Sequence, residues 1–310
     1  MKTLILNSSN IVSGSNNSKY TYKFPSTVSF KKGSKVAIHK INMYYSWENI
    51  TSLNNNNSFS YMWYDTAGVL NKTYSLVIPN GNYSIEDIND WMYYELCNRG
   101  HYLTYSSATN VKGHNNGQTY SSSVKYVFIQ FTENSTYYSA QIRLYALPLY
   151  HATTPTYTLA TVTGYEWRPP ALNSGGTYSA PKIIFSSSNK FNLIMGFRTT
   201  TLGTSSITSA SGYEDFLSTS TPVVDPVGSV IVLCDMCKNT LSSPTSLIDS
   251  FTYTEDYGSM IKIESNNWAW NDILEGSYHE FSIEFKDQNF NPMYIKDANN
   301  VILLVLDIPE

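Results

Sequence analysis

Few residues of this 310-residue chain combine a reactive side chain with a spacing that could do chemistry. The sharpest motif is Cys234-Asp235-Met236-Cys237, whose two thiols are spaced as in metal-binding and redox motifs. A zinc site needs a second ligand pair, and Cys97 and His279 each stand alone. A redox pair normally opens a helix, whereas this one ends the apolar run Val230–Leu233. We therefore expect buried or edge thiols, with no metal and no other cofactor.

Paired carboxylates are the second arrangement that could do chemistry, because glycoside hydrolases act through two of them. No pair lies beside a tryptophan in a pattern that indicates a sugar cleft, and solvated surfaces explain them equally well. The five histidines are scattered, and phosphate-binding glycine loops and the G-x-S-x-G elbow are absent. The sequence therefore predicts no catalytic residue and no enzyme. The pairs considered are Glu86 with Asp87, Glu255 with Asp256, and Asp272 with Glu275.

Aromatic residues form the third group. Trp268-Ala269-Trp270 would place two indoles on one face of a strand, and Glu166-Trp167-Arg168-Pro169-Pro170 places another beside a rigid turn. Such residues serve as sugar-stacking platforms or as anchors in cores and subunit interfaces. We favour anchors, and sugar stacking remains the alternative. The candidate interface or stacking aromatics are Tyr44, Tyr45, Trp47, Trp167, Trp268 and Trp270.

The composition favours a protein that works in an assembly. Charged residues make up 14% of the chain, against roughly 25% in typical domains. Aromatic residues reach 15%, and 26 of them are tyrosines. Neutral Ser, Thr, Asn and Tyr must therefore cover the surface, and burying them against a partner costs little desolvation. Tyr and Trp are also enriched in interface cores, although secreted lectins share this composition.

Charge and sequence patterning bear on partners and location. The net charge of −4 provides no basic stripe, so we expect no direct nucleic-acid binding. Three cysteines, an odd number, favour a reducing compartment. The opening MKTLILN turns polar too early for a secretory signal. The longest strongly apolar run, Val301–Leu306, has the length of a strand, so no membrane span is expected.

Short runs with period-two alternation, separated by Gly, Asn, Ser and Pro, predict a chain built mainly of β-strands. Pro25 ends the first run or confines it to a sheet edge. The apolar parity changes within Val36–Tyr45, which predicts a bulge near His39-Lys40. The predicted strands are 20–24, 36–45, 59–64, 74–78, 124–131, 140–147, 182–185, 230–234, 247–253, 281–285 and 301–308.

One helix is predicted, from Ser84 to just before Gly100. Ser84 can cap the amide of Asp87, and Gly100 supplies a left-handed stop. Apolar residues at helical spacing indicate a single amphipathic helix packed on a sheet, and they are Ile85, Ile88, Met92 and Leu96.

The texture of the sequence changes between about residues 101 and 180, where Ser, Thr, Tyr and Gly prevail and loops are expected at 104–111 and 172–179. More apolar strands resume at Lys182. We therefore expect residues 1–100 and 181–310 to form one discontinuous β domain and residues 101–180 to form an inserted β-rich subdomain. A long loop is expected over Thr199–Ser220.

Four segments, in order, resemble the penton proteins of virophages of the Sputnik and Mavirus type and of related polinton-type elements. Ile41–Ile50 resembles an early strand ending in a Ser-Trp-x-Asn turn. Ile78–Ser84 resembles a Pro-Gly-Asn-Tyr helix entry, with Asn80 inserted after the proline. Leu193–Phe197 resembles a Leu-Gly-Phe motif, with Met195 in place of the leucine. Residues 281–289 together with 301–306 resemble the final hairpin of the family. The resemblance does not extend to residues 101–180.

This resemblance implies an all-β fold, a single jelly-roll β-sandwich with one short helix. It implies a structural capsid protein: a homopentamer at the fivefold vertices of an icosahedral virion, bordered by a double-jelly-roll major capsid protein. Assembly would occur in the cytoplasm of the infected host cell. The resemblance says nothing of 101–180; the polar texture of this insertion and its position between core strands predict that it faces outward, where it could meet a host-surface or host-virus ligand. The alternative that stays open is a carbohydrate-binding β-sandwich or a viral attachment domain.

Overall fold

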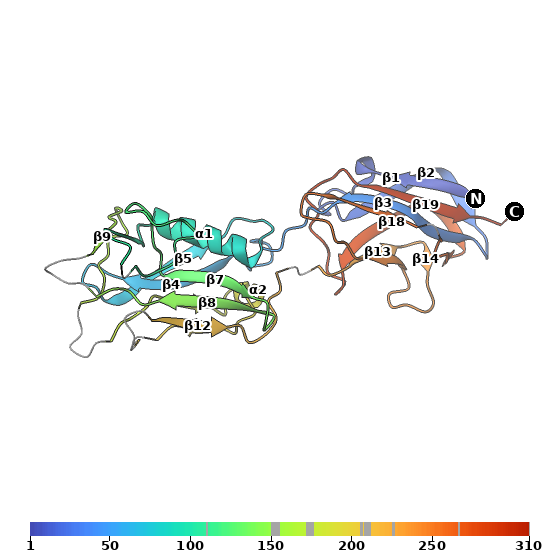
Figure 1. Ribbon diagram of the computed structural model, residues 1–310. Coiled ribbons are helices and arrows are strands. Elements are labelled where there is room, and N and C mark those ends of the chain that lie inside the picture. Colours follow the sequence, from blue (N-terminus) through green and yellow to red (C-terminus); the bar gives the residue numbers. More distant parts are fainter. Residues whose placement is uncertain are drawn as a thin grey trace. The chain divides into compact units, whose positions relative to one another are not determined.

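The computed structural model describes residues 1–309 apart from 110, 150–155, 172–176, 205–206, 208–211, 225–226 and 266. Parts of the three expected loops, 104–111, 172–179 and 199–220, thus lie outside the described residues. The chain forms two compact units, Met1–Glu48 with Asp225–Glu310 (unit 1) and Asn49–Val224 (unit 2). Both are built mainly from β-sheets (Figure 1), which confirms the all-β fold class.

Unit 1 is a sandwich of two antiparallel sheets. The smaller sheet has the order β15-β13-β18-β2, and the larger has the order β1-β19-β3-β17-β14, with β16 also paired to β3. The strands are β1 (Lys2–Leu6), β2 (Lys19–Phe30), β3 (Lys35–Tyr44), β13 (Val230–Cys234), β14 (Cys237–Lys238), β15 (Leu247–Phe251), β16 (Met260–Glu264), β17 (Asn271–Ile273), β18 (Gly276–Asp287) and β19 (Val301–Asp307); a 3-10 turn, η1, spans Ser8–Asn10.

This strand order is that of a jelly roll. In the usual lettering, B to I along the chain, the smaller sheet reads B-I-D-G from β2 to β15. In the larger sheet β3 is strand C, the broken pair β16 and β17 is strand H, and β14 is strand E. The connection 239–246 takes the place of strand F. The jelly roll that the resemblance implies is therefore confirmed.

The predicted bulge lies on β3 at His39. Leu303 of β19 pairs with Lys40, but the next residue, Leu304, pairs with Ile38, so His39 is the extra residue. Strand H breaks at the same place: β16 pairs with β3 as far as Lys40, and β17 resumes at Val36. A bulge on the central strand therefore interrupts the ladder on both sides.

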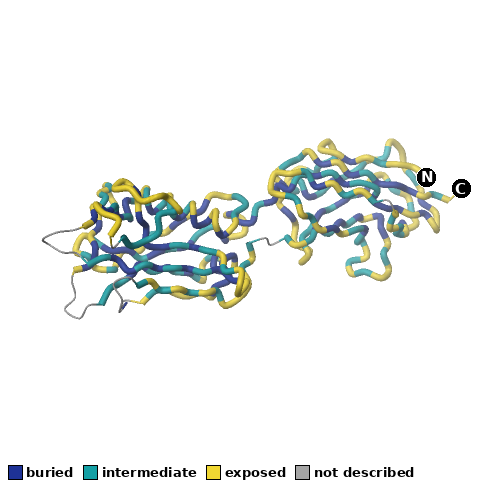
Figure 2. Tube along the Cα trace, viewed as in Figure 1, coloured by how far each residue is buried: buried dark blue, intermediate teal, exposed yellow. Residues whose placement is uncertain are grey.

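The first predicted strand also behaves as expected. β2 continues through Pro25 to Phe30, and it forms an edge of the smaller sheet, where a missing backbone donor is tolerated. Its pairing with β18 shifts register between Tyr278 and Glu280, in the stretch that faces the proline. Inward residues of both sheets form one core, and buried and exposed residues alternate along the strands (Figure 2).

Unit 2 contains a four-stranded sheet β11-β10-β4-β5, a three-stranded sheet β12-β8-β7 and a pair β6-β9. Its elements are β4 (Ser58–Tyr64), β5 (Leu70–Val77), α1 (Ile85–Asn98), β6 (Leu103–Tyr105), β7 (Ile129–Asn134), β8 (Ser139–Tyr145), β9 (Tyr157–Leu159), β10 (Lys182–Phe185), α2 (Phe191–Ile194), β11 (Thr200–Leu202) and β12 (Tyr213–Leu217).

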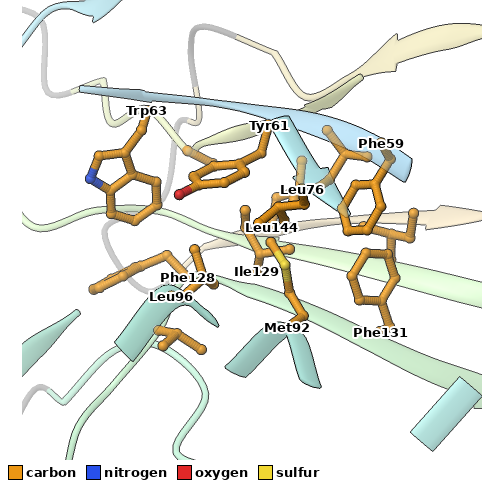
Figure 3. Close-up of a cluster of buried hydrophobic side chains, with 14 of the residues drawn as sticks. Phe59, Tyr61, Trp63, Leu76, Met92, Leu96, Phe128, Ile129, Phe131 and Leu144 are labelled. Carbon is orange, nitrogen blue, oxygen red and sulfur yellow. The ribbon is translucent and has the colours of Figure 1, made fainter. Parts of the chain in front are cut away.

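The core of unit 2 lies between β4, β7 and α1. Phe59 and Trp63 project from β4 toward Phe131 of β7 and toward Met92 and Leu96 of α1 (Figure 3). The helix begins as predicted, because the Ser84 hydroxyl accepts the Asp87 amide at 3.1 Å. Gly100 follows it with φ of +71°. The short helix α2 was not predicted.

The domain boundaries expected from the sequence are wrong. The insertion is the whole of Asn49–Val224, and it enters the jelly roll between β3 and β13. Residues of 101–180, among them Phe128, Phe131 and Ile142, share one core with Phe59 and Ile88 of the preceding segment. The polar texture belongs to outward positions and turns, and the period-two inward residues fill the core. The loop expected at 199–220 also contains the two strands β11 and β12.

A glycine in unit 2 has a conformation that no other residue accepts easily. Gly196 has φ of +71°, and an added Cβ would collide with the Ser220 carbonyl oxygen. The amides of Thr219 and Ser220 both donate to the Gly196 carbonyl at 3.1 Å. The glycine in the Leu-Gly-Phe-like motif is therefore required by backbone packing within this unit.

Candidate functional site

The predicted aromatic residues at the end of β3 form a cluster inside unit 1. The ring of Tyr45 lies 4.7 Å from those of Trp47 and Tyr253, measured between centroids. Trp47 Nε1 donates to the Tyr253 hydroxyl at 3.1 Å, and that hydroxyl donates to the Val227 carbonyl at 2.6 Å. Tyr45 and Trp47 are only 8% and 3% exposed, so they pack the core and leave little ring surface for a ligand. Tyr44 is half-buried at the end of the strand.

Hydrogen bonds inside each unit join the segment where the chain leaves that unit to the segment where it returns. Within unit 1, the bonds from Trp47 through Tyr253 to Val227 join the departing and returning segments. Within unit 2, the buried Asn49 side chain donates to the carbonyls of Tyr83 and Val224 and accepts the Tyr83 amide. Trp47 of the Ser-Trp-x-Asn turn therefore takes part in such a connection within unit 1, and Asn49 takes part in one within unit 2.

Trp167 is a core residue of unit 2. Its Nε1 donates to the Gly100 carbonyl at 2.8 Å, its ring lies 5.0 Å from that of Trp63, and it is 4% exposed. An edge of the indole nevertheless borders an open pocket of about 640 Å³. The pocket is lined by Thr66, Tyr157, Thr158, Leu159, Trp167, Arg168 and Pro169. Threonine, tyrosine, tryptophan and arginine are thus among the residues that line it.

Trp268 and Trp270 are half-buried in the segment between β16 and β17, beside the bulge. This segment is not a strand, so the expected placement on one strand face is wrong. The two indoles still meet edge to face, with centroids 5.5 Å apart. Trp268 Nε1 donates to His39 Nδ1 at 3.1 Å, which requires that nitrogen to be unprotonated.

An apolar surface lies on the outward side of the larger sheet. We assign the two indoles to it, because neither belongs to the core cluster of unit 1 and Trp268 bonds to His39 at the bulge. Ala37 and Val305 are buried but are not part of the core cluster of unit 1. Ala37 of β3 pairs with Val305 of β19. The residues that precede them in the chain, Val36 and Leu304, point into the core, so the side chains of Ala37 and Val305 point outward. We call this surface outer face 1; its residues are Ile5, Val301, Leu303, Val305, Trp268 and Trp270.

Most of outer face 1 is exposed or half-exposed. Ile5 is 53% exposed and Val301 is 39% exposed, whereas their neighbours Leu6 and Ile302 are buried in the core. An antiparallel sheet with one solvated face normally alternates apolar and polar residues, and a run that is apolar on both sides indicates burial on both sides. β19, with the sequence VILLVLD, therefore has an outward side suited to being covered.

The residues considered for chemistry lie in different environments. Cys234 and Cys237 are buried, as predicted, and burial raises the pKa of the Cys237 thiol to about 11 and that of Cys234 further. Within the described ranges, no three His, Cys, Asp or Glu side chains gather closely enough to hold a metal ion. Asp87 caps α1 through the Ser84 amide and hydroxyl. The other carboxylates considered lie at exposed or half-exposed positions.

A buried histidine was missed by the sequence reasoning. His101 is fully buried in unit 2, where its Nδ1 lies 2.7 Å from the Tyr61 hydroxyl and its ring stacks 4.7 Å from that of Trp63. Burial, and then the nearby Arg99 guanidinium, lower the pKa of His101 to about 3. Position 101 follows the helix stop directly, but no periodicity signals that its side chain points inward.

The fold is thus a jelly-roll sandwich interrupted by a second β-rich unit. Among solved structures, the chain is similar to the crystal structure of selenomethionine-labelled mavirus penton protein. The match covers 99% of this chain and 98% of that one, with 11% sequence identity and a TM-score of 0.40. A score this low adds nothing to the fold assignment, which rests on the strand order of the chain itself.

No protein-family model and no curated protein sequence matches the chain. Neither helix in the described part of the chain combines the length and hydropathy needed to cross a bilayer.

Proposed function

We propose that this chain is a structural subunit of a viral capsid, a homopentamer at the fivefold vertices of an icosahedral virion. The observation that carries the proposal is the B-I-D-G sheet of unit 1, opposite a larger sheet whose outward side is apolar. Jelly rolls build viral capsid and lectin domains, and an apolar outer face favours assembly with other subunits. The four ordered segments that resemble penton proteins support the same choice.

The architecture suits this role. A ring of five head-to-tail subunits needs two different faces on one subunit, and a two-sheet sandwich provides them. The partners would be four further copies and a double-jelly-roll major capsid protein, in a virion assembled in the cytoplasm of the host cell. Unit 2, inserted between strands C and D, would face outward, where it could meet a host-surface or host-virus ligand. The proposal assigns no reaction and no cofactor to the chain.

Cryo-electron microscopy of shells tests this function. The chain would be co-expressed with the double-jelly-roll major capsid protein of the same virus. We expect fivefold density at the vertices that fits five copies of unit 1, with density for unit 2 outside the shell. Shells that exclude the chain, or that hold it away from the fivefold positions, would contradict the proposal.

A second candidate function is carbohydrate binding by unit 2, favoured by the pocket beside Trp167 and Arg168. Residue types of this kind, threonine, an aromatic residue and arginine, are suited to an acidic sugar. A glycan array on the purified chain tests this candidate, with Arg168→Ala as the variant. Saturable binding that the variant abolishes would support it, and an array without saturable binding would exclude it for the sugars tested.

A further inference from the structure

A second apolar surface lies on the opposite side of the jelly roll. β13 has the sequence VIVLC, and Val230, Val232 and Cys234 point into the core of unit 1. Ile231 and Leu233 are half-buried and do not belong to that core, so they face outward from the smaller sheet. Leu247 of β15, paired with Leu233, lies beside them. We call these three residues, Ile231, Leu233 and Leu247, outer face 2.

The two outer faces share an unusual feature. β13 and β19 each carry apolar residues on both sides, although each sheet has its partner sheet on one side only. Strands with this pattern are normally covered on both faces. The sandwich therefore presents two apolar stripes, on sides that point away from each other.

Each outer face carries one ion pair that forms within the chain. On outer face 1 the charged neighbours Lys40 and Glu264 form an ion pair at 3.4 Å. Outer face 2 has a second ion pair, between Lys286 and Glu284 of β18, at 3.6 Å. These two residues pair with Ile231 and Leu233 of β13 across the ladder. These two pairs need no charge from a partner, although Lys262 of β16 also lies on the outward side beside Val301. The apolar residues of each face can be covered by a surface that is itself apolar. The complementary surface present on the same chain is the other outer face.

We propose that outer face 1 of one copy packs against outer face 2 of the next, and that this head-to-tail contact closes the ring. The inference rests on the proposed function and adds the surfaces to it. A contact between two different faces propagates around a ring, whereas a contact of one face with itself stops at a dimer. The indoles of Trp268 and Trp270 would be the large aromatic anchors of the contact.

Complementary variants give a sharp test. Leu303→Lys places a charge in outer face 1, and Ile231→Lys places one in outer face 2. Both positions are half-exposed, so the lysine stems can reach solvent in the isolated chain and the fold is retained. A buried unpaired ammonium in the contact should weaken association about 100-fold or more. Val77→Lys, at a 63% exposed position of unit 2, is the matched control.

Native mass spectrometry reads the result. We expect pentamers for the wild type and for Val77→Lys, and monomers for Leu303→Lys and Ile231→Lys alone. An equimolar mixture of the two lysine variants should form dimers and nothing larger, because one intact face remains on each molecule and the two are complementary. A wild-type pentamer together with a mixture that stays monomeric would overturn the assignment of these faces while leaving the pentamer intact.

Other outcomes separate the inference from the function on which it rests. A wild type that is monomeric at every concentration would contradict the pentamer itself. If one lysine variant alone dissociates the assembly and the other is silent, the contact is not head to tail through these faces. Saturable glycan binding lost in Trp268→Ala would assign outer face 1 to a sugar instead.

Crosslinking provides a second measurement if a lysine variant fails to fold. Leu303→Cys and Ile231→Cys would each be made in a Cys97→Ser background, because Cys234 and Cys237 are buried. A short bis-maleimide should join the two cysteine variants when they are mixed. Val77→Cys mixed with either should give no crosslink; equal crosslinking of the control would refute the proposed contact.

Discussion

Acid should destabilise unit 2 through His101. The imidazole is buried and neutral, and its pKa is lowered to about 3, against an ordinary value of 6.5. Between these two pH values the unfolded chain binds a proton that the folded chain does not. The stability that His101 preserves is therefore fully present above pH 6.5 and is lost as the pH falls toward 3.

The size of the effect follows from the shift. Each pH unit between the two pKa values costs about 1.4 kcal/mol of unfolding free energy. Lowering the pH from 7.5 to 5.0 should therefore remove about 2 kcal/mol from the stability of unit 2 through this residue. His101→Gln removes the titrating group and keeps an acceptor for the Tyr61 hydroxyl. The variant should therefore not lose this part of its unfolding free energy when the pH is lowered.

The assay is urea unfolding at both pH values, followed by tryptophan fluorescence and by hydrogen exchange in β4, which carries Tyr61 and Trp63 and so reports on unit 2. Every other titrating group is common to the wild type and the variant, so the difference between them isolates His101. His279→Gln, on the exposed surface of β18, controls for the change of residue type. Equal losses of stability on acidification in the wild type and in His101→Gln would refute the reasoning.

Three further predictions concern the backbone and the thiols. Asn49→Ala removes three hydrogen bonds at the base of unit 2 and should cost about 3 kcal/mol of unfolding free energy by urea titration. Gly196→Ala should cost about 3 kcal/mol or more, against about 1 kcal/mol for Gly258→Ala, which shares a positive φ but meets no neighbour; equal costs would refute the collision. Among the thiols, half-buried Cys97 should react with a maleimide in the native protein well before Cys234, and equal rates would contradict the burial described here.

Sequence periodicity predicted much of the fold. Strands such as β2 and β18 alternate with period two because their outward side chains meet solvent. The change of parity around His39 placed the bulge correctly, because an extra residue must shift every later side chain to the other face. The cap of α1 was predictable because the side chain of Ser84 and the amide it accepts are only three residues apart.

The domain boundaries could not be predicted, because they depend on contacts distant in sequence. Phe59 and Phe131 share a core, and Asn49 bonds to Val224, yet nothing local links these residues. Strand H was also missed, because the bulge on β3 splits it into two short pieces around Trp268 and Trp270.

The candidate site was predicted in part. The aromatic residues were selected by type, but type does not distinguish an inward ring such as Trp47 from a half-exposed one such as Trp268. Both kinds of ring satisfy the same local pattern, and only the tertiary fold separates them. The apolar runs at 230–233 and 301–306 carried information that period-two alternation alone did not use, since each strand is apolar on both sides.

The number of copies in the native assembly tests the central claim most directly. Native mass spectrometry of the purified full-length chain, over a range of concentrations, should show a species of five times 35.0 kDa. The same species should persist in Val77→Lys. A chain that remains a monomer at every concentration, or that stops at a dimer, would contradict a head-to-tail pentamer.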